Sequence, residues 1–465
     1  MNKKLKLDVP LLVIIIFSLG NFVFVAREYA WADDWSFYSS YNGEGPSSFE
    51  EHLMGYRPLL QFLFDYLWPM MDSIDDLIVF RLISTLGMLL LSITVYRALG
   101  RLGFEKVPNL IFSVGVLFLP SFQIYQKWAT TFAYSWCALL SIFSWKLFVS
   151  KKYVLSFVML VAAFLIYQPA ATFGLVIVFA QSLQNLKVNR ENVYFCLNLV
   201  MTFLVGTLVG RLVQIYAGVD SKERAGIISS PEEAMEKLIW LITRPMTLAF
   251  RPFAWDSPTN LEILVPLLFF ILCTYSLWSK TGRSFRSLTY ILHVYAIFLL
   301  MLLPLIPIRE NQIEYRVLPS TSAAGLLFIV TTMYFFVAQR AKLSRYMLPI
   351  GMFTLAQVAI YSYSITSLIF VKPYVIAKEF IEVNLNNIEG PKLSYHISYQ
   401  DWPIRDFIGS PSAVYDLQMP WVAFPMVEYF SRDKFRVIEL VPESIKEEVT
   451  VLDLDEIKSI SIKSN

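Results

Sequence analysis

Eleven long apolar runs limit what this chain can fold into. A helix needs about 20 predominantly apolar residues to cross a bilayer, and runs close to that length recur throughout the 465 residues. They cover residues 9–26, 77–96, 107–125, 129–149, 153–167, 169–186, 192–217, 261–279, 287–305, 318–338 and 346–371. The pattern predicts an α-helical polytopic membrane protein with about 11 transmembrane helices.

The composition agrees with a membrane protein and argues against several other classes. Hydrophobic residues make up 56% of the chain and charged residues 16%, against about 45–50% and about 25% in soluble domains. A net charge of +2 argues against nucleic-acid binding, and an aromatic content of 16% argues against disorder. The three cysteines are too few for a disulfide scaffold, and each lies inside an apolar run.

Basic residues lie before the first run and after the second, fourth, sixth, eighth and tenth runs. They are Lys3, Lys4, Lys6, Arg97, Arg101, Lys106, Lys151, Lys152, Lys187, Arg190, Lys280, Arg283, Arg286, Arg340, Lys342 and Arg345. Short basic loops stay in the cytoplasm, so the N-terminus is predicted inside and the C-terminus outside. The first run is too long for a cleaved signal peptide. The lack of Asn-X-Ser/Thr sequons fits a bacterial cytoplasmic (inner) membrane.

Three segments are then predicted to face outward and are too long to be simple connectors. They are the first outer loop at 27–76, the second outer loop at 218–260 and the tail at 372–465. Long loops on a rigid scaffold commonly carry functional sites. The site of a catalytic membrane domain at 1–371 is therefore predicted on the extracytoplasmic face.

The tail carries mixed secondary-structure patterns. Apolar and polar residues alternate at 393–399, 435–441 and, more weakly, 459–462, which predicts strands. A helical pattern at 374–385 leads in from the last run. These patterns predict a small extracytoplasmic α/β domain at 372–465.

An adjacent pair of carboxylates lies just past the first apolar run. Residues 31–38 read Trp-Ala-Asp-Asp-Trp-Ser-Phe-Tyr, and such aromatic residues suit a membrane interface. Asp33 and Asp34 belong to a loop whose other charges are mostly acidic. Taken alone, the pair is more often part of a solvated acidic loop than a catalytic motif.

Two outward helices are predicted from local patterns. Residues 57–71 are too short to span, and Arg57, Gln61 and Asp65 recur every four residues on one face. This pattern is typical of an amphipathic interfacial helix. In the second outer loop, Ser230-Pro231-Glu232-Glu233 has the signature of a helix start. The helix that follows, at 230–243, is either a lid or a connector.

The first outer loop resembles a known family. One span, an aromatic-flanked Asp33-Asp34 and a Gly55-Tyr56-Arg57-Pro58 step resemble the GT-C superfamily of integral membrane glycosyltransferases. Within it, the chain is similar to bacterial glucosyltransferases that modify O-antigen. The resemblance is specific over about residues 9–97. Tyr56, inserted between Gly and Arg, departs from the family pattern.

The resemblance implies a sugar, glucose in that family, carried on polyprenyl phosphate. It would pass on the outer membrane face to a hydroxyl of a lipid-linked or nascent surface glycan. The implied pathway partners are a polyprenyl-phosphate glycosyltransferase and a small flippase. The chain shows no Gly-rich nucleotide motif, which agrees with a lipid-linked donor.

The residues suggest roles in a displacement at an anomeric carbon. A partly desolvated carboxylate can serve as the base for the acceptor hydroxyl, so we assign Asp33 as general base and Asp34 as its partner. Single displacement predicts inversion. No metal is assigned, since Mg²⁺ or another divalent cation usually takes more oxygen ligands than this pair supplies.

The phosphate of the donor needs cationic partners, for which arginine is well suited. The arginine candidates are Arg57, Arg81, Arg211, Arg224, Arg244, Arg251, Arg309 and Arg316, with Arg57 favoured because it shares the loop of Asp33. Acceptor or interfacial contacts are expected from Trp35, Tyr38, Gln61 and Asp65. For each arginine the alternative is an ordinary ion pair or a snorkelling side chain.

Two other functions compete with glycosyl transfer. A glycan polymerase would also use a large outer loop, typically with arginines rather than an Asp-Asp pair. A lipid or glycan transporter would carry ionisable residues near mid-membrane and inverted repeats. The sequence has no internal repeat, and its charged residues lie near the ends of the runs.

Overall fold

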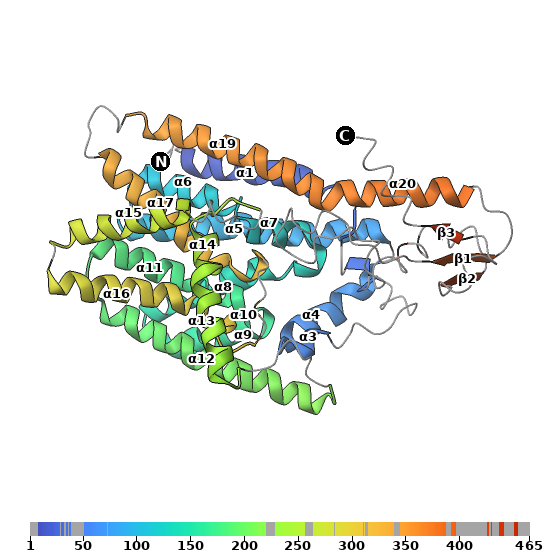
Figure 1. Ribbon diagram of the computed structural model, residues 1–465, viewed down its shortest axis with the longest axis horizontal. Helices are drawn as coiled ribbons and strands as arrows, with labels where there is room; N and C mark the ends of the chain where they lie inside the picture. Colours follow the sequence, from blue (N-terminus) through green and yellow to red (C-terminus); the bar gives the residue numbers. More distant parts are fainter. Residues whose placement is uncertain are drawn as a thin grey trace, which may run out of the picture.

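The computed structural model is a long bundle of helices with a small sheet at one end (Figure 1). It describes residues 8–27, 29–31, 34–35, 37–38, 51–71, 73–219, 228–255, 264–282, 284–309, 311, 315–338, 345–386, 392–396, 426, 429, 437–440 and 451–453. Asp33 and Arg224 lie outside these residues. Most helices run along the long axis, and the N-terminus lies at the end away from the sheet.

The helices follow the predicted apolar runs. The α-helices are α1 (Val9–Val25), α3 (Glu51–Met54), α4 (Pro58–Leu67), α5 (Leu77–Arg101), α6 (Lys106–Val116), α7 (Pro120–Lys127), α8 (Tyr134–Val149), α9 (Tyr153–Ile166), α10 (Gln168–Ala171), α11 (Gly174–Asn185), α12 (Arg190–Tyr216), α13 (Pro231–Thr243), α14 (Pro245–Ala249), α15 (Leu264–Lys280), α16 (Phe285–Leu300), α17 (Pro319–Ala338), α19 (Met347–Thr366) and α20 (Lys372–Asn386). Short 3-10 or π segments are η2 (Trp68–Met70), η3 (Ile74–Asp76), η4 (Ala129–Thr131), η6 (Leu303–Leu305), η7 (Tyr315–Val317) and η8 (Ser367–Val371).

Five helical segments of the described chain are long and apolar enough to cross a membrane. They are Ile74–Arg101, Ala129–Val149, Arg190–Tyr216, Pro319–Val337 and Met347–Val371, and a bent pair would make six. Several other predicted runs form helices that are shorter. The protein is therefore a helical chain compatible with a membrane location.

One predicted span is broken in the structure. The run at 107–125 was expected to be a single helix, but α6 and α7 meet at a bend of 48°. Pro120 starts α7 at its first position, where its missing N–H costs no helical hydrogen bond. The break directs α7 and the following Trp128 toward the first outer loop.

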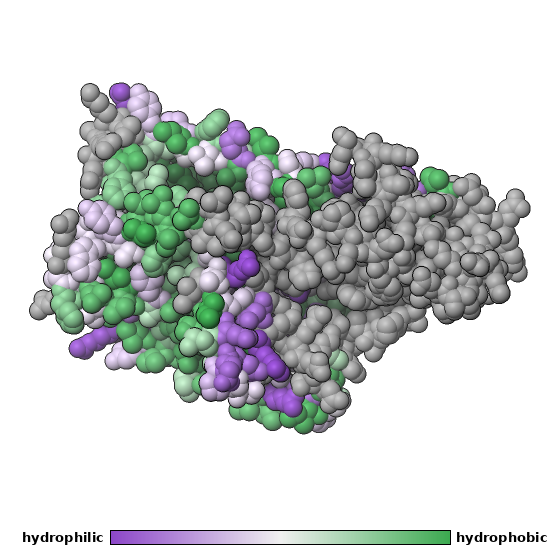
Figure 2. Space-filling view, viewed as in Figure 1, coloured by the Kyte–Doolittle hydropathy of each residue, from purple (hydrophilic) through white to green (hydrophobic). Residues whose placement is uncertain are grey.

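The outer surface of the bundle is apolar on the helices that would meet lipid. On α12, Leu197, Met201, Leu204, Leu208 and Leu212 are each more than half exposed, and their spacing places them along one stripe. Figure 2 shows similar green patches over the bundle end of the molecule. An apolar face this long is unusual on a soluble monomer, which agrees with a membrane location.

The helix α4 presents its polar face to the protein rather than to water. Gln61 is buried and Arg57 is half-buried, whereas Phe62 and Tyr66 are 62% and 64% exposed. An interfacial amphipathic helix usually turns its polar face to water, but these two residues face the protein. Their polar groups bond within the fold, so the apolar side chains take the outer surface. Only Asp65 of the three spaced polar residues is exposed.

The tail begins as a continuation of the last long helix. α19 runs through the π-helical turn η8 into α20, as the helical pattern at 374–385 predicted. Strands β1 (Lys392–His396), β2 (Val437–Leu440) and β3 (Val451–Asp453) form a parallel sheet in the order β2-β1-β3. The first two coincide with predicted strands, and the pattern at 459–462 lies outside the described residues.

Close packing of α17 on α14 yields a stability prediction. A Cβ at Gly325 would overlap the backbone carbonyl of Ala249, so Gly325→Ala should destabilise the protein by about 1–3 kcal/mol through overpacking. Gly20→Ala is the matched control, because a Cβ on Gly20 of α1 meets nothing within 4 Å. Thermal unfolding in detergent should show a lower midpoint for Gly325→Ala alone; equal midpoints would contradict this packing.

Candidate active site

The first outer loop is anchored through Asp34. This side chain is fully buried, and its Oδ2 accepts the N–H of Trp31 at 3.1 Å. Its Oδ1 accepts the N–H of Thr130 at 3.0 Å, which ties the loop to η4. Because both carboxylate oxygens receive backbone amides, Asp34 fixes the position of the chain on either side of it.

Arg81 holds the start of the same loop through hydrogen bonds to its backbone. It is fully buried, and its guanidinium donates to the carbonyl oxygens of Val25, Arg27 and Tyr29 at 2.5–3.3 Å. Val25 is the last residue of α1 and the other two residues follow it, where carbonyls lack helical hydrogen-bond partners. The Arg81 guanidinium thus supports the loop and is directed at backbone oxygens.

Tyr29 links this anchor to α7. Its hydroxyl donates to the carbonyl of Lys127 at 2.8 Å, and its ring lies 4.0 Å from the Arg81 guanidinium. Burial raises the pKa of Tyr29 above its ordinary value, Arg81 opposes this, and the Asp34 carboxylate adds to it. The phenol therefore stays protonated and remains a donor at neutral pH.

Lys127 is a buried basic residue beside the loop. It is fully buried, and its Nζ donates to Gln123 Oε1 and Thr366 Oγ1. The Nζ also lies 4.1 Å from the centre of the Phe24 ring. An ionisable group buried among membrane helices is a functional hypothesis by default.

Arg57 is positioned by a tight turn and by α10. Tyr56, the residue inserted relative to the family pattern, adopts a positive φ of 58°. Gln168 Nε2 donates to the carbonyls of Gly55 and Tyr56 at 3.1 Å each. A Cβ on Gly55 would lie 3.3 Å from Arg57 Nε, so glycine leaves room for the guanidinium.

The Arg57 guanidinium lies against a pair of stacked tyrosines. It is 4.8 Å from the Tyr167 ring centre, and Nη1 lies 3.4 Å from the Tyr134 hydroxyl. Tyr134 and Tyr167 are stacked with their ring centres 3.7 Å apart and planes 4° apart. A cation on an aromatic face is attracted by the ring quadrupole, which holds Arg57 at the edge of the bundle.

Arg316, far away in sequence, reaches the same cluster. Its carbonyl accepts hydrogen bonds from the hydroxyls of Tyr125 and Tyr167 at 2.6 and 3.2 Å. Its guanidinium lies 4.9 Å from the centre of the Trp128 ring, which packs edge-on against Trp31. Arg316 is therefore placed between the Asp34 loop and the tyrosine pair.

The structure thus brings together three of the predicted site residues. Asp34 bonds to Thr130, two residues after Trp128; Arg316 covers Trp128 and contacts Tyr167; and Arg57 covers Tyr167. These three residues are named the Asp34–Arg57–Arg316 cluster. The name also covers the residues packed around them, which are Tyr125, Tyr134, Tyr167 and Gln168. It combines one carboxylate, two guanidinium groups and several aromatic rings.

The remaining predicted residues have other surroundings. Arg211 is exposed and donates to Gln214 on α12, and Arg244 is exposed before α14. Arg251 is half-buried just after α14. We define the site by the contacts described above, which do not involve these three arginines.

The predicted acceptor residues fall in two groups. Gln61 donates to Asp65 at 2.7 Å on α4. Trp35 is fully buried and stacks on Tyr374 of α20, with 6.2 Å between ring centres. Tyr38 packs edge-on against Tyr429 of the tail at 5.6 Å. Trp35 and Tyr38 therefore connect the first outer loop to the C-terminal segment.

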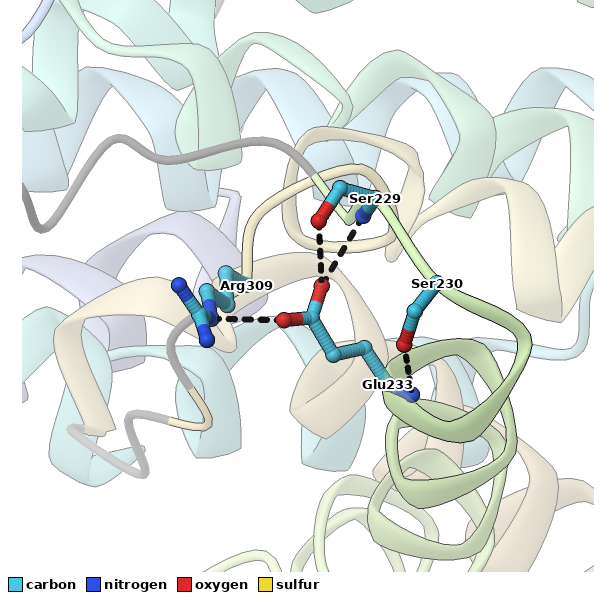
Figure 3. Close-up of polar contacts among 4 residues, drawn as sticks. All are labelled: Ser229, Ser230, Glu233 and Arg309. Carbon is cyan, nitrogen blue, oxygen red and sulfur yellow. Dashed lines mark hydrogen bonds and ion pairs between the residues drawn. The ribbon is translucent and has the colours of Figure 1, made fainter.

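The second outer loop forms the expected helix α13 with an altered cap. Ser230 Oγ accepts the N–H of Glu233 at 3.2 Å, as predicted, but Glu233 reaches back to Ser229 rather than to Ser230 (Figure 3). Glu233 Oε1 also pairs with Arg309 Nε at 2.9 Å. Arg309 thus joins α13 to the segment before η7.

This ion pair gives a pH-dependent prediction. The Ser229 N–H, and more weakly the Arg309 guanidinium, hold the pKa of Glu233 below its ordinary value of 4.5. The stabilisation is present above that value and is lost as the pH falls through the lower folded pKa. Glu233→Gln should therefore lower the thermal midpoint at pH 7, and the difference from wild type should shrink below pH 4.5.

The control for this experiment is Glu236→Gln on the same helix. Glu236 is exposed, so its replacement should leave the midpoint unchanged at both pH values. A difference between wild type and Glu233→Gln that stays constant with pH would contradict the carboxylate's role in anchoring α13.

A divalent cation would need ligands besides Asp34. No group of three or more His, Cys, Asp or Glu side chains gathers within the described part of the chain. Both Asp34 oxygens accept backbone N–H groups, a role that competes with metal coordination. We therefore derive no chemistry through a metal.

Sequence reasoning missed several members of the site. Tyr125, Tyr134 and Tyr167 lie in apolar runs, where an aromatic residue is an ordinary core residue. Lys127 had a detectable signal, since it is a basic residue in a short connection predicted to face outward. That position breaks the rule placing basic loops in the cytoplasm.

Comparison with known proteins gives no family assignment. No protein-family model matches the chain, and no curated protein matches it. The residues of the Asp34–Arg57–Arg316 cluster and the sequence resemblance are therefore what indicates a function.

Proposed function

We propose that the protein is a membrane glycosyltransferase that moves a sugar from a polyprenyl-phosphate donor to a hydroxyl of a surface glycan. The observation that carries the proposal is the meeting of the Asp34 loop, Arg57 and Arg316 in one cluster. Asp33 and Asp34 are adjacent in sequence, and a carboxylate together with two guanidinium groups suits a reaction that takes a proton from an alcohol and releases a phosphate monoester.

In the proposed reaction, the acceptor oxygen attacks the anomeric carbon of the donor sugar. The bond between that carbon and the phosphate oxygen breaks, and both bonding electrons leave with polyprenyl phosphate. The hydroxyl proton passes to the carboxylate of Asp33. One displacement inverts the anomeric configuration.

The two aspartates take different roles in this proposal. The backbone amides of Trp31 and Thr130 occupy the Asp34 oxygens, which supports Asp34 as the residue that positions the loop. This leaves Asp33 as the proposed general base. Arg57 and Arg316 are the proposed phosphate ligands, since bidentate hydrogen bonds suit this group.

The finer architecture belongs to the same proposal. We infer about 11 transmembrane helices, from the apolar runs, in a GT-C-like domain at 1–371. The basic loops place the N-terminus in the cytoplasm and the site on the outer face of a bacterial inner membrane. The tail at 372–465 would form a small extracytoplasmic α/β domain, which the three parallel strands support.

The test uses purified protein in bilayer discs with a radiolabelled polyprenyl-phosphate hexose and a lipid-linked glycan acceptor. Transfer of one labelled hexose to the acceptor, with glucose preferred, is the expected result. Without the protein, no label should reach the acceptor. Failure with all hexoses tested, at normal folding, would contradict the proposal.

The same assay separates the alternative functions. A glycan polymerase would lengthen the acceptor by whole repeat units and would need no hexosyl phosphate donor. A transporter would move labelled lipid between leaflets without forming a glycosidic bond. Nothing in the contacts of the described residues favours either function over glycosyl transfer.

A further inference from the structure

A second polar region lies at the opposite end of the bundle from the Asp34–Arg57–Arg316 cluster. There a cavity of about 370 Å³ opens between the α5–α6 connection, the end of α11, the end of α15 and the second half of α17. These elements lie at the end of the molecule away from the sheet (Figure 1). The cavity falls within the size range of ligand sites, roughly 300–1,000 Å³.

The walls of this cavity have two different characters. Phe104, Leu277, Phe328 and Phe335 supply an apolar lining. Gln184 Nε2 donates to the carbonyl of Gly103 at 3.2 Å, which ties the wall from α11 to the α5–α6 connection. The cavity is therefore amphiphilic, with an apolar interior between helices and a polar end at the loops.

One cation and one anion line the polar end. Lys280 ends α15, and its Nζ lies 4.4 Å from the ring centre of Phe335. Glu105 precedes α6 and is exposed. Among the described residues, neither side chain has an ion-pair partner. Each charge is thus available to a ligand that carries the opposite charge.

We propose that this cavity binds the head group of a zwitterionic aminophospholipid of the phosphoethanolamine type. The lipid phosphate would pair with Lys280, and its primary ammonium would donate to the Glu105 carboxylate. The acyl chains would follow the apolar lining toward the bilayer. An anionic lipid would satisfy Lys280 but would leave the Glu105 carboxylate without a cationic partner, which disfavours it.

A lipid is favoured over a soluble zwitterion by the position of the cavity. The neighbouring surface of α15 exposes Leu267, Leu268, Ile271 and Tyr275, so the helix that ends at Lys280 has an apolar outer face. Basic pockets between transmembrane helices on the cytoplasmic side bind lipid head groups, and Lys280 supplies a basic residue at the polar end of this cavity. This inference does not depend on sugar transfer.

Native mass spectrometry of the purified full chain tests the proposal. The probes are phosphatidylethanolamine, phosphatidylcholine and phosphatidylglycerol with identical acyl chains. Phosphatidylethanolamine should be retained at about tenfold lower concentration than either competitor, since only it presents both a phosphate and a primary ammonium. Equal retention of the three lipids, or preference for phosphatidylglycerol, would overturn the proposal.

Two variants test the assigned contacts. Lys280→Ala should weaken retention of every lipid. Glu105→Gln should abolish the preference of about tenfold for phosphatidylethanolamine over phosphatidylcholine. Lys187→Ala is the control, because this exposed lysine lies at the same end but outside the cavity. Unchanged selectivity in Glu105→Gln would contradict the ammonium contact.

A measurement on the wild-type protein tests the site without depending on whether the variants fold. A photoactivatable phosphatidylethanolamine should label peptides of α15 or α17 that line the cavity, and unlabelled phosphatidylethanolamine should compete. Competition by soluble glycerophosphoethanolamine at the same concentration would overturn the lipid assignment. Labelling confined to other helices would overturn the site.

Discussion

Asp33→Asn should reduce sugar transfer by about 10²–10⁴-fold at an unchanged protein level, because a positioned general base contributes that much to rate. The amide of asparagine keeps the size of the side chain but cannot accept the proton of the attacking hydroxyl. The measurement is the initial rate of labelled hexose transfer in bilayer discs, normalised to folded protein. The loss should fall on kcat rather than on donor KM.

Two further variants make the result specific to Asp33. Asp75→Asn changes an exposed carboxylate of the same loop and should leave the rate within about twofold, since exposed substitutions rarely matter. Asp34→Asn should reduce thermal stability as well as the rate, because a buried backbone amide of Trp31 or Thr130 loses its carboxylate acceptor. Near-normal transfer by Asp33→Asn would rule out its role as base.

Arg57→Lys should reduce kcat/KM for the polyprenyl-phosphate donor by about 10–100-fold. Lysine keeps the charge but loses the planar fork that can bind phosphate oxygens in pairs, and a charged hydrogen bond is worth about 1.5–3 kcal/mol. It also loses the contacts with Gln168 and the Tyr134 hydroxyl that aim the guanidinium. The assay varies the donor concentration at saturating acceptor.

The control for Arg57 is Arg101→Ala at the other end of the bundle. Arg101 ends α5 and is exposed, so its loss should leave donor kinetics unchanged. An Arg57→Lys variant with normal donor kinetics but reduced thermal stability would show that Arg57 only holds the α10 contact. In that case Arg316 would be the remaining cation of the cluster.

The positions of the helices could be predicted from the sequence, but a break within a predicted helix could not. Apolar runs of membrane length can be recognised from composition alone, because a membrane helix satisfies its own backbone hydrogen bonds. The bend between α6 and α7 was missed. The proline at position 120 was visible, yet proline within an apolar run is tolerated in membrane helices.

The orientation of α4 shows a different limit. The four-residue spacing of Arg57, Gln61 and Asp65 correctly placed them on one helix face. The periodicity of a helix says which residues share a face, but not what that face meets. Gln168 and the tyrosine pair lie opposite this face, so Arg57 points into the fold.

Only part of the site could be predicted from the sequence. The acidic pair and Arg57 were recognised in sequence as a motif within one loop. Arg316 was one of several arginine candidates, and its place before Leu318-Pro319 at the start of a late apolar run was only a weak family-like signal. Its contacts with Trp128, Tyr125 and Tyr167 distinguish it.

The sequence by itself determined the helical class of the protein, its apolar segments and the segregation of its charges, because these depend on local composition and on spacing along one helix. The tertiary structure alone decided which charges lie together. Asp34 and Arg57 come from different parts of the first outer loop and Arg316 from a distant segment, and packing of α7, α8 and α10 places aromatic rings between them. Such long-range contacts arise from the simultaneous burial of many side chains, which no local pattern encodes.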